Sequence, residues 1–336
     1  MKNKKIGFTA FHTAALLDTE IALPEGDGVL VEMEYTVISG GTERSCLMNL
    51  RGNMKYPAYL GYCGVGRVLQ TGPAVQSVAA GDRVLVYHGH HAKYNLRSEK
   101  DITKVENDGI PSLEAAFVII ASMGLGGVRK LEVELGESAM VMGLGLLGIF
   151  ALQFLRLSGA YPVIAADLNP ARRQLALELG ADYAFDPAAP DFAEQVKAVT
   201  CGKGVRATVE VTGVSRAMKQ ALQCAAPMGR ISLLGCTRVS DCPVDYYSQV
   251  HRPGVKLIGA HNFVRPKVES YPHHWTHQDD CKAILALLGA GRIQAAPIIS
   301  RVVKPEDAPE IYNQLCDDSQ FPMGTVFDWR NLQCED

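Results

Sequence analysis

The feature that most constrains the fold is a glycine-rich turn between a strand and a helix. Residues 138–142 predict a buried strand, and the apolar run 149–157 predicts the helix that follows. Gly143, Gly145 and Gly148 lie between them at the G-x-G-x-x-G spacing. In such a turn the first glycine permits a tight bend, the second lets a pyrophosphate approach the backbone, and the third lets helix and strand pack closely. The helix N-terminus then faces the phosphate charge, which predicts a bound dinucleotide.

The acidic residue expected after the next strand indicates which dinucleotide binds. A strand is predicted at 162–166, and it ends in Asp167, about 20 positions beyond the last glycine. A carboxylate there accepts hydrogen bonds from the ribose hydroxyls of NAD and repels the extra phosphate of NADP. NAD is therefore the favoured cofactor. NADP stays open as an alternative, because Arg172 and Arg173 follow one turn into the next helix and can receive a 2′-phosphate.

Length and composition limit the class of protein. The 336 residues suffice for two domains with separate cores. A net charge of −3 leaves no broad basic surface, so we expect a small-molecule substrate and neither nucleic acid nor membrane as a partner. The N-terminus lacks a long apolar core, and no run of eighteen apolar residues occurs. Nine cysteines without a Cys-x-x-Cys pair favour the cytoplasm.

The pattern of predicted secondary structure changes once along the chain. The first third is rich in short strands and turns, whereas the part after about residue 121 alternates strands with helices, as a parallel sheet requires. Near the end, Thr276 and Asp279 are a capping pair for a helix at 278–288, with Gly291 after it, and a last strand at 325–329 returns to the first domain. Further strands are predicted at 28–34, 64–69, 81–87, 207–211, 230–234 and 255–258, and further helices at 123–131, 146–158, 170–179 and 215–226.

Seven short signatures occur in an order that resembles the medium-chain dehydrogenase/reductase superfamily, which includes zinc alcohol dehydrogenases and zinc-free quinone reductases. The resemblance implies an α/β chain with a doubly wound parallel-sheet (Rossmann) domain at 123–260. A mostly β, GroES-like substrate domain would be formed by 1–122 and 261–336. It also implies a homodimer or homotetramer. The signatures are Gly40-Gly-Thr42, Gly61-Tyr-Cys-Gly-Val-Gly66, Gly81-Asp-Arg-Val84, the turn at 143–148, Leu179-Gly-Ala-Asp182, Glu210-Val-Thr-Gly213 and Leu234-Gly235.

The form of the first signature is more specific. Ile38-Ser-Gly-Gly-Thr-Glu-Arg44, followed by Tyr56-Pro-Ala-Tyr-Leu-Gly-Tyr62, resembles a branch with an S-x-G-T-E-R motif that includes bacteriochlorophyllide dehydrogenases. The superfamily resemblance also implies cofactor contacts beyond the glycines and Asp167. These are Leu146, Leu147, Arg172, Val211, Thr212, Leu234, Gly235 and Ile258.

The zinc ligands of the superfamily are missing. At the three ligand positions that the resemblance implies, this chain has Gly40, Tyr62 and either Ile119 or Ile120. Glycine and isoleucine offer no lone pair, and a neutral tyrosine is a poor zinc ligand beside imidazole and thiolate. The lobe of four closely spaced cysteines is absent as well. We therefore expect a zinc-free enzyme.

An unorthodox metal site is the alternative. His90 and His91 follow closely on the expected strand at 81–87, and with Cys63 and Cys46 they offer imidazole and thiolate ligands. Their spacing fits no standard metal pattern.

Without zinc, side chains must move the proton and stabilise charge on the substrate oxygen. His88 is the leading acid/base, because it ends a strand where the resemblance places a substrate-lining residue, although it can simply bond a loop. Tyr62 follows, since it occupies the position of the lost histidine ligand. Thr42 has the family's proton-relay position, and Glu43 either takes part in the chemistry or holds its turn by accepting backbone N–H bonds.

Aromatic residues suggest the kind of substrate. Tyr56 and Tyr59, together with His88 and Tyr62, suit a polar ring better than a long apolar chain. Trp275 and His277 offer flat faces for a sugar, unless they belong to a solvated loop before a helix.

These observations predict an NAD-dependent, zinc-free oxidoreductase acting on a secondary alcohol or its ketone, with a polyol, sugar or sugar derivative as substrate. Two other functions stay open. One is an enzyme of the lyase or epimerase type that uses hydride transfer transiently, and the other is a redox-sensing module that binds NAD without turnover.

Overall fold

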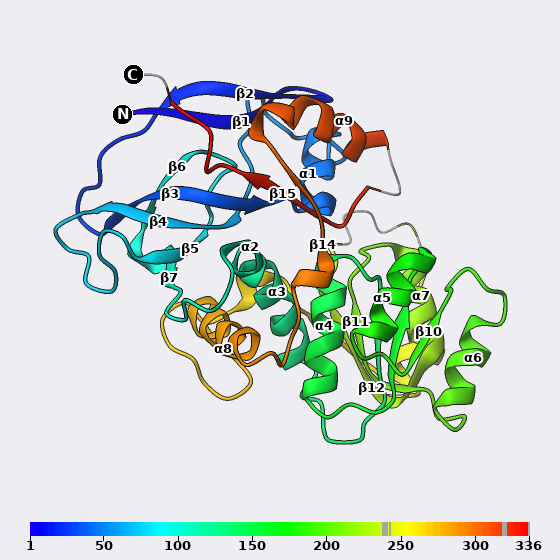
Figure 1. Ribbon diagram of the computed structural model, residues 1–336. Helices are drawn as coiled ribbons and strands as arrows, with labels where there is room; N and C mark the ends of the chain where they lie inside the picture. Colours follow the sequence, from blue (N-terminus) through cyan, green and yellow to red (C-terminus); the bar gives the residue numbers. More distant parts are fainter. Residues whose placement is uncertain (237–240, 242, 318–320, 335–336) are drawn as a thin grey trace. The chain divides into compact units, whose positions relative to one another are not determined.

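The chain folds into two compact units (Figure 1). The computed structural model describes residues 1–236, 241, 243–317 and 321–334. One unit comprises Met1–Ile119 and Cys281–Asp336, and the other comprises Ile120–Asp280. The chain passes between the units inside two helices, α3 (Val118–Arg129) and α8 (His277–Gly289).

The first unit is mainly antiparallel β-structure. Within its described residues, one sheet has the order β14-β15-β3-β4-β5-β7, β6 also pairs with β3, and β1 and β2 form a separate hairpin. Strand β5 is buried at each position, as expected of a strand that is covered on both faces. The elements are β1 (Lys2–Ala10), β2 (Thr13–Glu20), β3 (Gly28–Val37), α1 (Gly40–Leu47), β4 (Cys63–Thr71), β5 (Arg83–Tyr87), β6 (Tyr94–Ser98), β7 (Ile102–Lys104), α2 (Ser112–Ala115), β14 (Ile299–Val303), α9 (Ala308–Asp317) and β15 (Gly324–Asp328).

The C-terminal part of the chain completes the core of this unit. Strand β15 pairs with β3 through Val326 and Val37. Trp329, just after β15, is fully buried, and its indole N–H donates to the hydroxyl of Thr36 at 2.8 Å. Burying a large apolar side chain contributes roughly 1.5–3 kcal/mol. The prediction that the last strand returns to the first domain is confirmed.

The second unit is a parallel sheet with helices packed on it. Its described residues give the strand order β10-β9-β8-β11-β12-β13. Helix α4 packs on β8 and β9, α5 on β9 and β10, and α7 on β11 and β12 (Figure 1). The elements are β8 (Ala139–Met142), α4 (Leu146–Leu157), β9 (Val163–Ala166), α5 (Pro170–Glu178), β10 (Tyr183–Phe185), α6 (Phe192–Val199), β11 (Val205–Glu210), α7 (Ser215–Cys224), β12 (Ala225–Leu233) and β13 (Lys256–Gly259).

The expected fold class is confirmed: a Rossmann-type domain joined to a GroES-like domain. The predicted strands and helices of the second unit agree with the observed ones to within a few residues, except that α3 begins at Val118 and β12 at Ala225. The short elements β10 and α6 were not predicted, nor were β1, β2, α1, β6, β7, α2, β14 and α9 in the first unit.

The second crossing between the units lies later than expected. The sequence suggested that the Rossmann domain ends at residue 260, but residues 261–280 pack with the second unit. Charge explains this placement. Asp280 is 1 % exposed and accepts hydrogen bonds from Arg129 at 2.7 Å and from Arg265 at 2.6 Å. A carboxylate that leaves water needs such partners, and both arginines belong to the second unit.

None of the helices formed by the described residues is long and apolar enough to span a membrane.

Candidate functional site

The glycine turn after β8 has the geometry that a dinucleotide requires. Gly143 has a φ of +93°, which favours glycine. A Cβ atom on Gly148 would overlap the carbonyl oxygen of Gly143, so helix α4 can pack on the turn only with glycine there. A Cβ atom on Gly145, in contrast, would meet nothing within 4 Å. The fold thus requires the first and third glycines, whereas the second leaves open space beside the N-terminus of α4, the place where dinucleotide-binding turns of this kind hold a pyrophosphate.

Asp167 is held against this turn. One carboxylate oxygen accepts a hydrogen bond from the backbone N–H of Leu144 at 2.6 Å, and the other accepts one from Asn169 at 2.8 Å. Each ionised oxygen keeps a further lone pair for a ribose hydroxyl. The acid predicted from its spacing is therefore positioned beside the turn before any ligand binds.

The two arginines of α5 differ. Arg173 donates to the backbone carbonyls of Asp167 at 2.7 Å and Leu168 at 3.0 Å, and it lies 3.4 Å from a carboxylate oxygen of Asp186. It is thus engaged in holding the loop. Arg172 is half-buried and forms no ion pair within the described part of the chain.

One further loop reaches the glycine turn, and a second loop packs on the first. A Cβ atom on Gly143 would lie 2.8 Å from Thr212, and one on Gly235 would lie 2.6 Å from the carbonyl carbon of Val211. The buried Glu210 holds the first loop by accepting from the N–H groups of Thr212 at 2.8 Å and Gly213 at 3.2 Å. Burial raises the pKa of Glu210, and these hydrogen bonds oppose the rise.

The other predicted cofactor residues lie on neighbouring elements. Leu146 and Leu147 form the first turn of α4, Leu234 follows β12, and Ile258 lies in β13, opposite Ser232.

In the first unit, a buried carboxylate organises the residues predicted to be catalytic. Glu43 in α1 is fully buried. It accepts hydrogen bonds from the N–H of Ser39 at 2.8 Å and from the hydroxyl of Tyr312 at 2.6 Å, and His91 Nε2 lies 3.2 Å from both of its oxygens. The bond from Ser39 matches the structural role expected of Glu43. The partners Tyr312 and His91 were not predicted.

His91 connects Glu43 to the core. Its Nδ1 atom lies 2.7 Å from the hydroxyl of Thr36, which also accepts a hydrogen bond from Trp329. Because the Thr36 oxygen accepts the hydrogen bond from Trp329, its own hydroxyl hydrogen can be donated to Nδ1. Nε2 then carries the hydrogen that Glu43 accepts. The chain of hydrogen bonds therefore has one consistent direction, from the tryptophan to the carboxylate.

Tyr62 is hydrogen-bonded to two residues that neighbour Glu43 in or just before α1. The hydroxyl of Tyr62 lies 2.6 Å from that of Ser39. Burial raises the pKa of Tyr62 well above its usual value, and hydrogen bonds with Ser39 and Thr42 oppose the rise. Tyr62 therefore stays protonated at neutral pH. Tyr62, Thr42 and Glu43 thus belong to one cluster, and Ser39, which we had not predicted, joins them.

His88 is not hydrogen-bonded to these hydroxyl groups in the described part of the chain. Because Cys63 pairs with Tyr87, Tyr62 and His88 are the residues just beyond that end of the β4–β5 ladder. His88 has a φ of +55°, and its ring packs 3.7 Å from the ring of Tyr87, centroid to centroid. Desolvation lowers its pKa, which favours the neutral form of the ring. Within the described residues, His88 forms no hydrogen bond with Tyr62.

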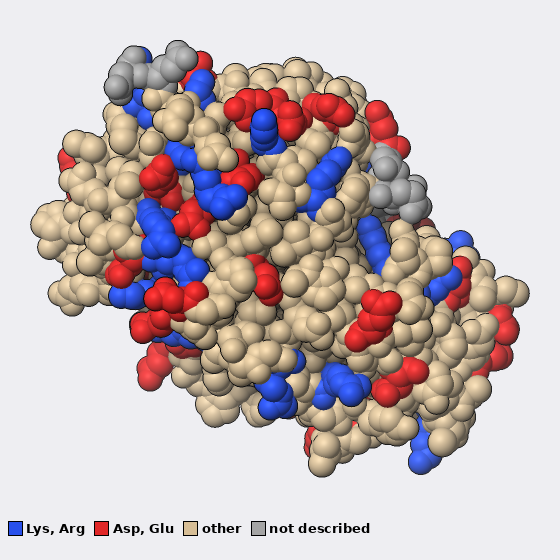
Figure 2. Space-filling model, in the orientation of Figure 1, with Lys and Arg blue, Asp and Glu red and all other residues tan. Residues whose placement is uncertain are grey.

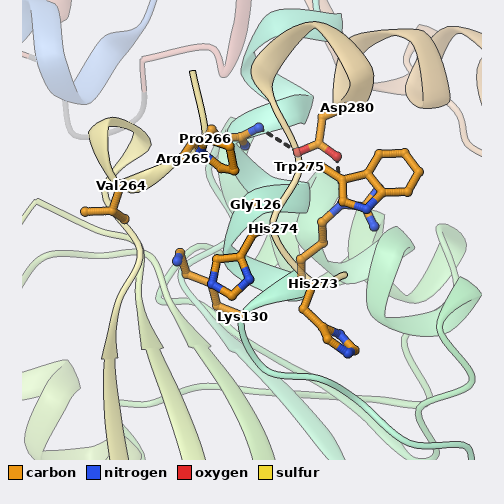
Figure 3. A pocket seen from close by; sticks show the side chains of 10 residues that line it. Gly126, Lys130, Val264, Arg265, Pro266, His273, His274, Trp275 and Asp280 are labelled. Atoms are coloured by element: carbon orange, nitrogen blue, oxygen red, sulfur yellow. Dashed lines mark hydrogen bonds and ion pairs between the residues drawn. The ribbon is translucent and has the colours of Figure 1, made fainter. Parts of the chain in front are cut away.

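The predicted substrate residues are divided between the units. Tyr56 donates to the carbonyl of Leu47 at 3.2 Å, and Tyr59 lies beneath the ammonium group of Lys5. In the second unit, Trp275 lines a pocket near the start of α8, whereas His277 is not among its lining residues (Figure 3). The lining residues are Gly126, Arg129, Lys130, Val264, Arg265, Pro266, His273, His274, Trp275 and Asp280.

That pocket is occupied in part by its own side chains. The guanidinium of Arg129 lies 3.8 Å from the centre of the Trp275 ring and also binds Asp280. One face of the indole is therefore covered by a cation. His277 instead has its Nδ1 atom 3.1 Å from the hydroxyl of Ser122.

No group of three or more His, Cys, Asp or Glu side chains is arranged to hold a metal ion within the residues that the structure describes. The alternative site of Cys46, Cys63, His90 and His91 thus does not assemble. Cys63 donates to the carbonyl of Val37, and burial raises the pKa of its thiol, which disfavours the thiolate that a metal requires.

Two family models match the chain. The model described as "Alcohol dehydrogenase GroES-like domain" matches residues 25–131, and the one described as "Zinc-binding dehydrogenase" matches residues 147–273.

Similar proteins carry dehydrogenase names. L-threonine 3-dehydrogenase of Pyrococcus horikoshii is 28% identical, over 88% of this chain and 90% of its own length. D-guloside 3-dehydrogenase of Escherichia coli is 26% identical, over 80% and 77% respectively. A solved structure of a putative zinc-binding dehydrogenase from Sinorhizobium meliloti, bound to NADP, superposes with a TM-score of 0.83 at 22% identity and covers 98% of this chain and 99% of its own. This last likeness is one of fold.

The different roles of two glycines in the same turn generate a prediction. Gly148→Ala should destabilise the second unit by about 1–3 kcal/mol, because the added methyl group overpacks the turn. Gly145→Ala should unfold like the parent protein, since its Cβ atom meets open space and its φ of −68° suits alanine. It should nevertheless bind NAD at least about tenfold more weakly, because the methyl group fills the space for the pyrophosphate. Chemical unfolding and calorimetric titration with NAD measure both. Parent-like NAD affinity of Gly145→Ala would contradict the assignment.

Proposed function

Because the chain belongs to the medium-chain dehydrogenase/reductase (alcohol dehydrogenase-like) superfamily, we propose that it is an NAD-dependent, zinc-independent oxidoreductase that interconverts a secondary alcohol and a ketone. The observation that carries the proposal is a pair of sites. The second unit holds a glycine turn suited to a dinucleotide. The first unit holds a cluster of hydroxyl groups and a carboxylate around Tyr62, which occupies one of the positions where the family resemblance implies a zinc ligand.

Asp167 supports NAD as the cofactor. Both of its oxygens are oriented by backbone N–H groups beside the open space at Gly145, so its negative charge stays near the ribose. A 2′-phosphate would be repelled there. Arg173, one of the two cations that can neutralise such a phosphate, is already engaged by two carbonyl groups and Asp186. These contacts favour NAD over NADP.

Two side chains support proton transfer without a metal. Bound NAD supplies the hydride acceptor at its nicotinamide ring. Tyr62 keeps its proton and donates a hydrogen bond to the substrate oxygen, stabilising the charge that develops there. Desolvation lowers the pKa of His88 and favours its neutral form, which accepts a proton during alcohol oxidation. Ser39 and Thr42 form hydrogen bonds with the Tyr62 hydroxyl, and Glu43 positions Ser39 by accepting a hydrogen bond from its backbone N–H.

The residue types support zinc independence. Gly40 and Ile119 or Ile120 provide no ligand atom. The Tyr62 hydroxyl is bonded to Ser39 and stays protonated. Two residues of the alternative metal site are also poor ligands. Cys63 remains a thiol, and both nitrogens of His91 are hydrogen-bonded, one to Thr36 and the other to Glu43.

A polyol, a sugar or a sugar derivative is the proposed substrate. Two similar proteins are named 3-dehydrogenases, one of L-threonine and one of a D-guloside. Polar aromatic side chains at Tyr56, Tyr59 and Tyr62 add hydroxyl groups to the first unit, which suits a substrate rich in hydroxyls.

The proposal also covers the partners, the oligomeric state and the cellular location of the enzyme. On the face shown in Figure 2, basic and acidic side chains are interspersed, which fits a small-molecule partner better than nucleic acid or an anionic membrane. We further propose a homodimer or homotetramer, as the family resemblance implies. We also propose a cytoplasmic location, because the nine cysteines include no Cys-x-x-Cys pair.

A substrate panel tests the function. We expect net NADH formation when the protein is given NAD and a set of sugars and polyols, with lower kcat/KM when NADP replaces NAD. Absorbance at the NADH band measures it. Product formation without net NADH would instead indicate transient hydride transfer, and nucleotide binding without turnover would indicate a sensor. Either of these outcomes would overturn the dehydrogenase proposal.

Metal content gives a second test. Purified protein should contain less than stoichiometric zinc, and strong chelators should leave its activity intact, because its ligand positions cannot coordinate the ion. Elemental analysis before and after chelation decides the matter. A zinc ion held tightly in each chain and lost together with activity would contradict zinc independence.

Variants of the two proposed proton-handling residues give a third test. Tyr62→Phe and His88→Asn should each lower kcat by about 10²–10⁴-fold, because each removes a group that acts on the transition state. NAD affinity should change little, since both residues belong to the first unit. Tyr94→Phe, which removes a half-buried hydroxyl from the same unit, is the matched control. Near-normal turnover of both variants at saturating substrate would rule out this replacement of zinc.

A further inference from the structure

Three basic side chains gather in the first unit and take no part in the hydrogen bonds of the Glu43 cluster. Lys5 belongs to β1, Arg97 belongs to β6, and His90 lies in the turn between β5 and β6. They approach one another because β1 runs beside that turn: the N–H of Ile6 donates to the carbonyl of His91 at 2.8 Å. All three side chains are half-buried.

The turn that carries His90 is fixed. Asn95 on β6 accepts a hydrogen bond from the N–H of His90 at 2.8 Å and returns one to its carbonyl at 3.1 Å. Because side chains alternate along a strand, Asn95 and Arg97 lie on the same face of β6. Tyr59 completes the arrangement, with its ring centre 4.3 Å from the ammonium of Lys5 and 6.1 Å from the His90 ring.

The charge of this group is not balanced locally. Neither Lys5 nor Arg97 forms an ion pair within the described residues. The facing titratable groups are His88 and Asp101, and Asp101 is the acid that interacts with Arg97. Desolvation lowers the pKa of both Lys5 and Arg97, and Arg97 lowers that of Lys5 further. Burial together with these two cations lowers the pKa of His90 to about 4.

Hydrogen bonding is incomplete as well. His90 Nδ1 and Arg97 Nε are buried and have no hydrogen-bond partner among the described residues. Buried polar nitrogen atoms without partners cost free energy, and so do two partly desolvated cations without a counterion. A fold that keeps such a group in place gains if an anion binds there.

We propose that Lys5, His90 and Arg97 form a binding site for a small oxyanion, either a phosphate or a carboxylate group. Arginine matches the geometry of such groups with its planar fork, and lysine adds a compact point charge. Neutral His90 donates one N–H, and the ring of Tyr59 shields one side of the Lys5 ammonium from water.

The location allows two sources for the oxyanion. His91, next to His90, donates its backbone N–H to the carbonyl of Leu60, two residues before Tyr62, and its ring contacts Glu43. The proposed anion site and the hydroxyl cluster are thus built on the same two turns. The oxyanion is either a free anion or a charged group on the substrate.

Phosphate binding to the full-length protein tests the site. Calorimetric titration with inorganic phosphate, and separately with acetate, is performed with and without NAD, so that binding at the glycine turn is recognised. We expect saturable binding of at least one of them that NAD does not abolish. Lys5→Met and Arg97→Gln should each weaken it at least tenfold, and Arg97→Lys should lose less. Lys2→Met, the same change at an exposed lysine of β1, is the control and should bind like the parent protein.

The calorimetric titration does not use turnover, so its outcome is independent of the proposed function. Absence of saturable binding of both anions, or equal binding by the parent protein, Lys5→Met and Arg97→Gln, would overturn the proposal. Circular dichroism verifies that each variant is folded, and Arg97→Lys provides the comparison if Arg97→Gln is not. Competitive inhibition by phosphate against the alcohol would identify a group on the substrate as the source. Binding without competition would identify a free anion, and both results support the site.

Discussion

The buried carboxylate of Glu43 is the interaction on which the first unit depends. A fully buried charge is stable only if several donors surround it, and here the donors come from distant parts of the chain: Ser39 precedes α1, His91 follows β5, and Tyr312 lies in α9. His91 then passes the network through Thr36 to Trp329. One carboxylate therefore ties the C-terminal segment to the N-terminal strands. It also orients Ser39, whose hydroxyl holds Tyr62.

This arrangement determines how charge on the substrate oxygen is stabilised in the proposed reaction. A zinc ion would supply a positive charge that stabilises an alkoxide directly. The first unit instead offers neutral donors in a desolvated place, and burial keeps the Tyr62 proton in position at neutral pH. The second unit offers open space and a negative charge instead of buried neutral donors. It leaves open space at Gly145 and holds one oriented negative charge beside it, which suits a ligand with hydroxyl groups and a pyrophosphate.

The same contrast explains how far each site could be predicted. The glycines and Asp167 belong to one continuous βαβ stretch, so spacing alone located them. In the first unit, spacing and family resemblance identified Tyr62, Thr42 and Glu43 but not their partners, because His91 and Tyr312 lie 48 and 269 positions from Glu43. His88 was the leading acid/base candidate, yet its side chain packs on Tyr87 rather than bonding to the hydroxyl cluster. Its positive φ, which redirects the side chain, leaves no clear sign in the sequence.

The sequence by itself determined the fold class, the parallel sheet with its glycine turn, and the residue types on which the proposal of zinc independence rests, because hydrophobic periodicity, glycine spacing and residue identity are local properties. Tertiary structure decided where residues 261–280 belong, since that depends on Arg129 and Arg265 meeting Asp280. It also decided which groups surround Glu43 and which cations gather near His90. Such assemblies depend on burial and on long-range strand pairing, and the cost of desolvating a charge is set only when the chain is folded.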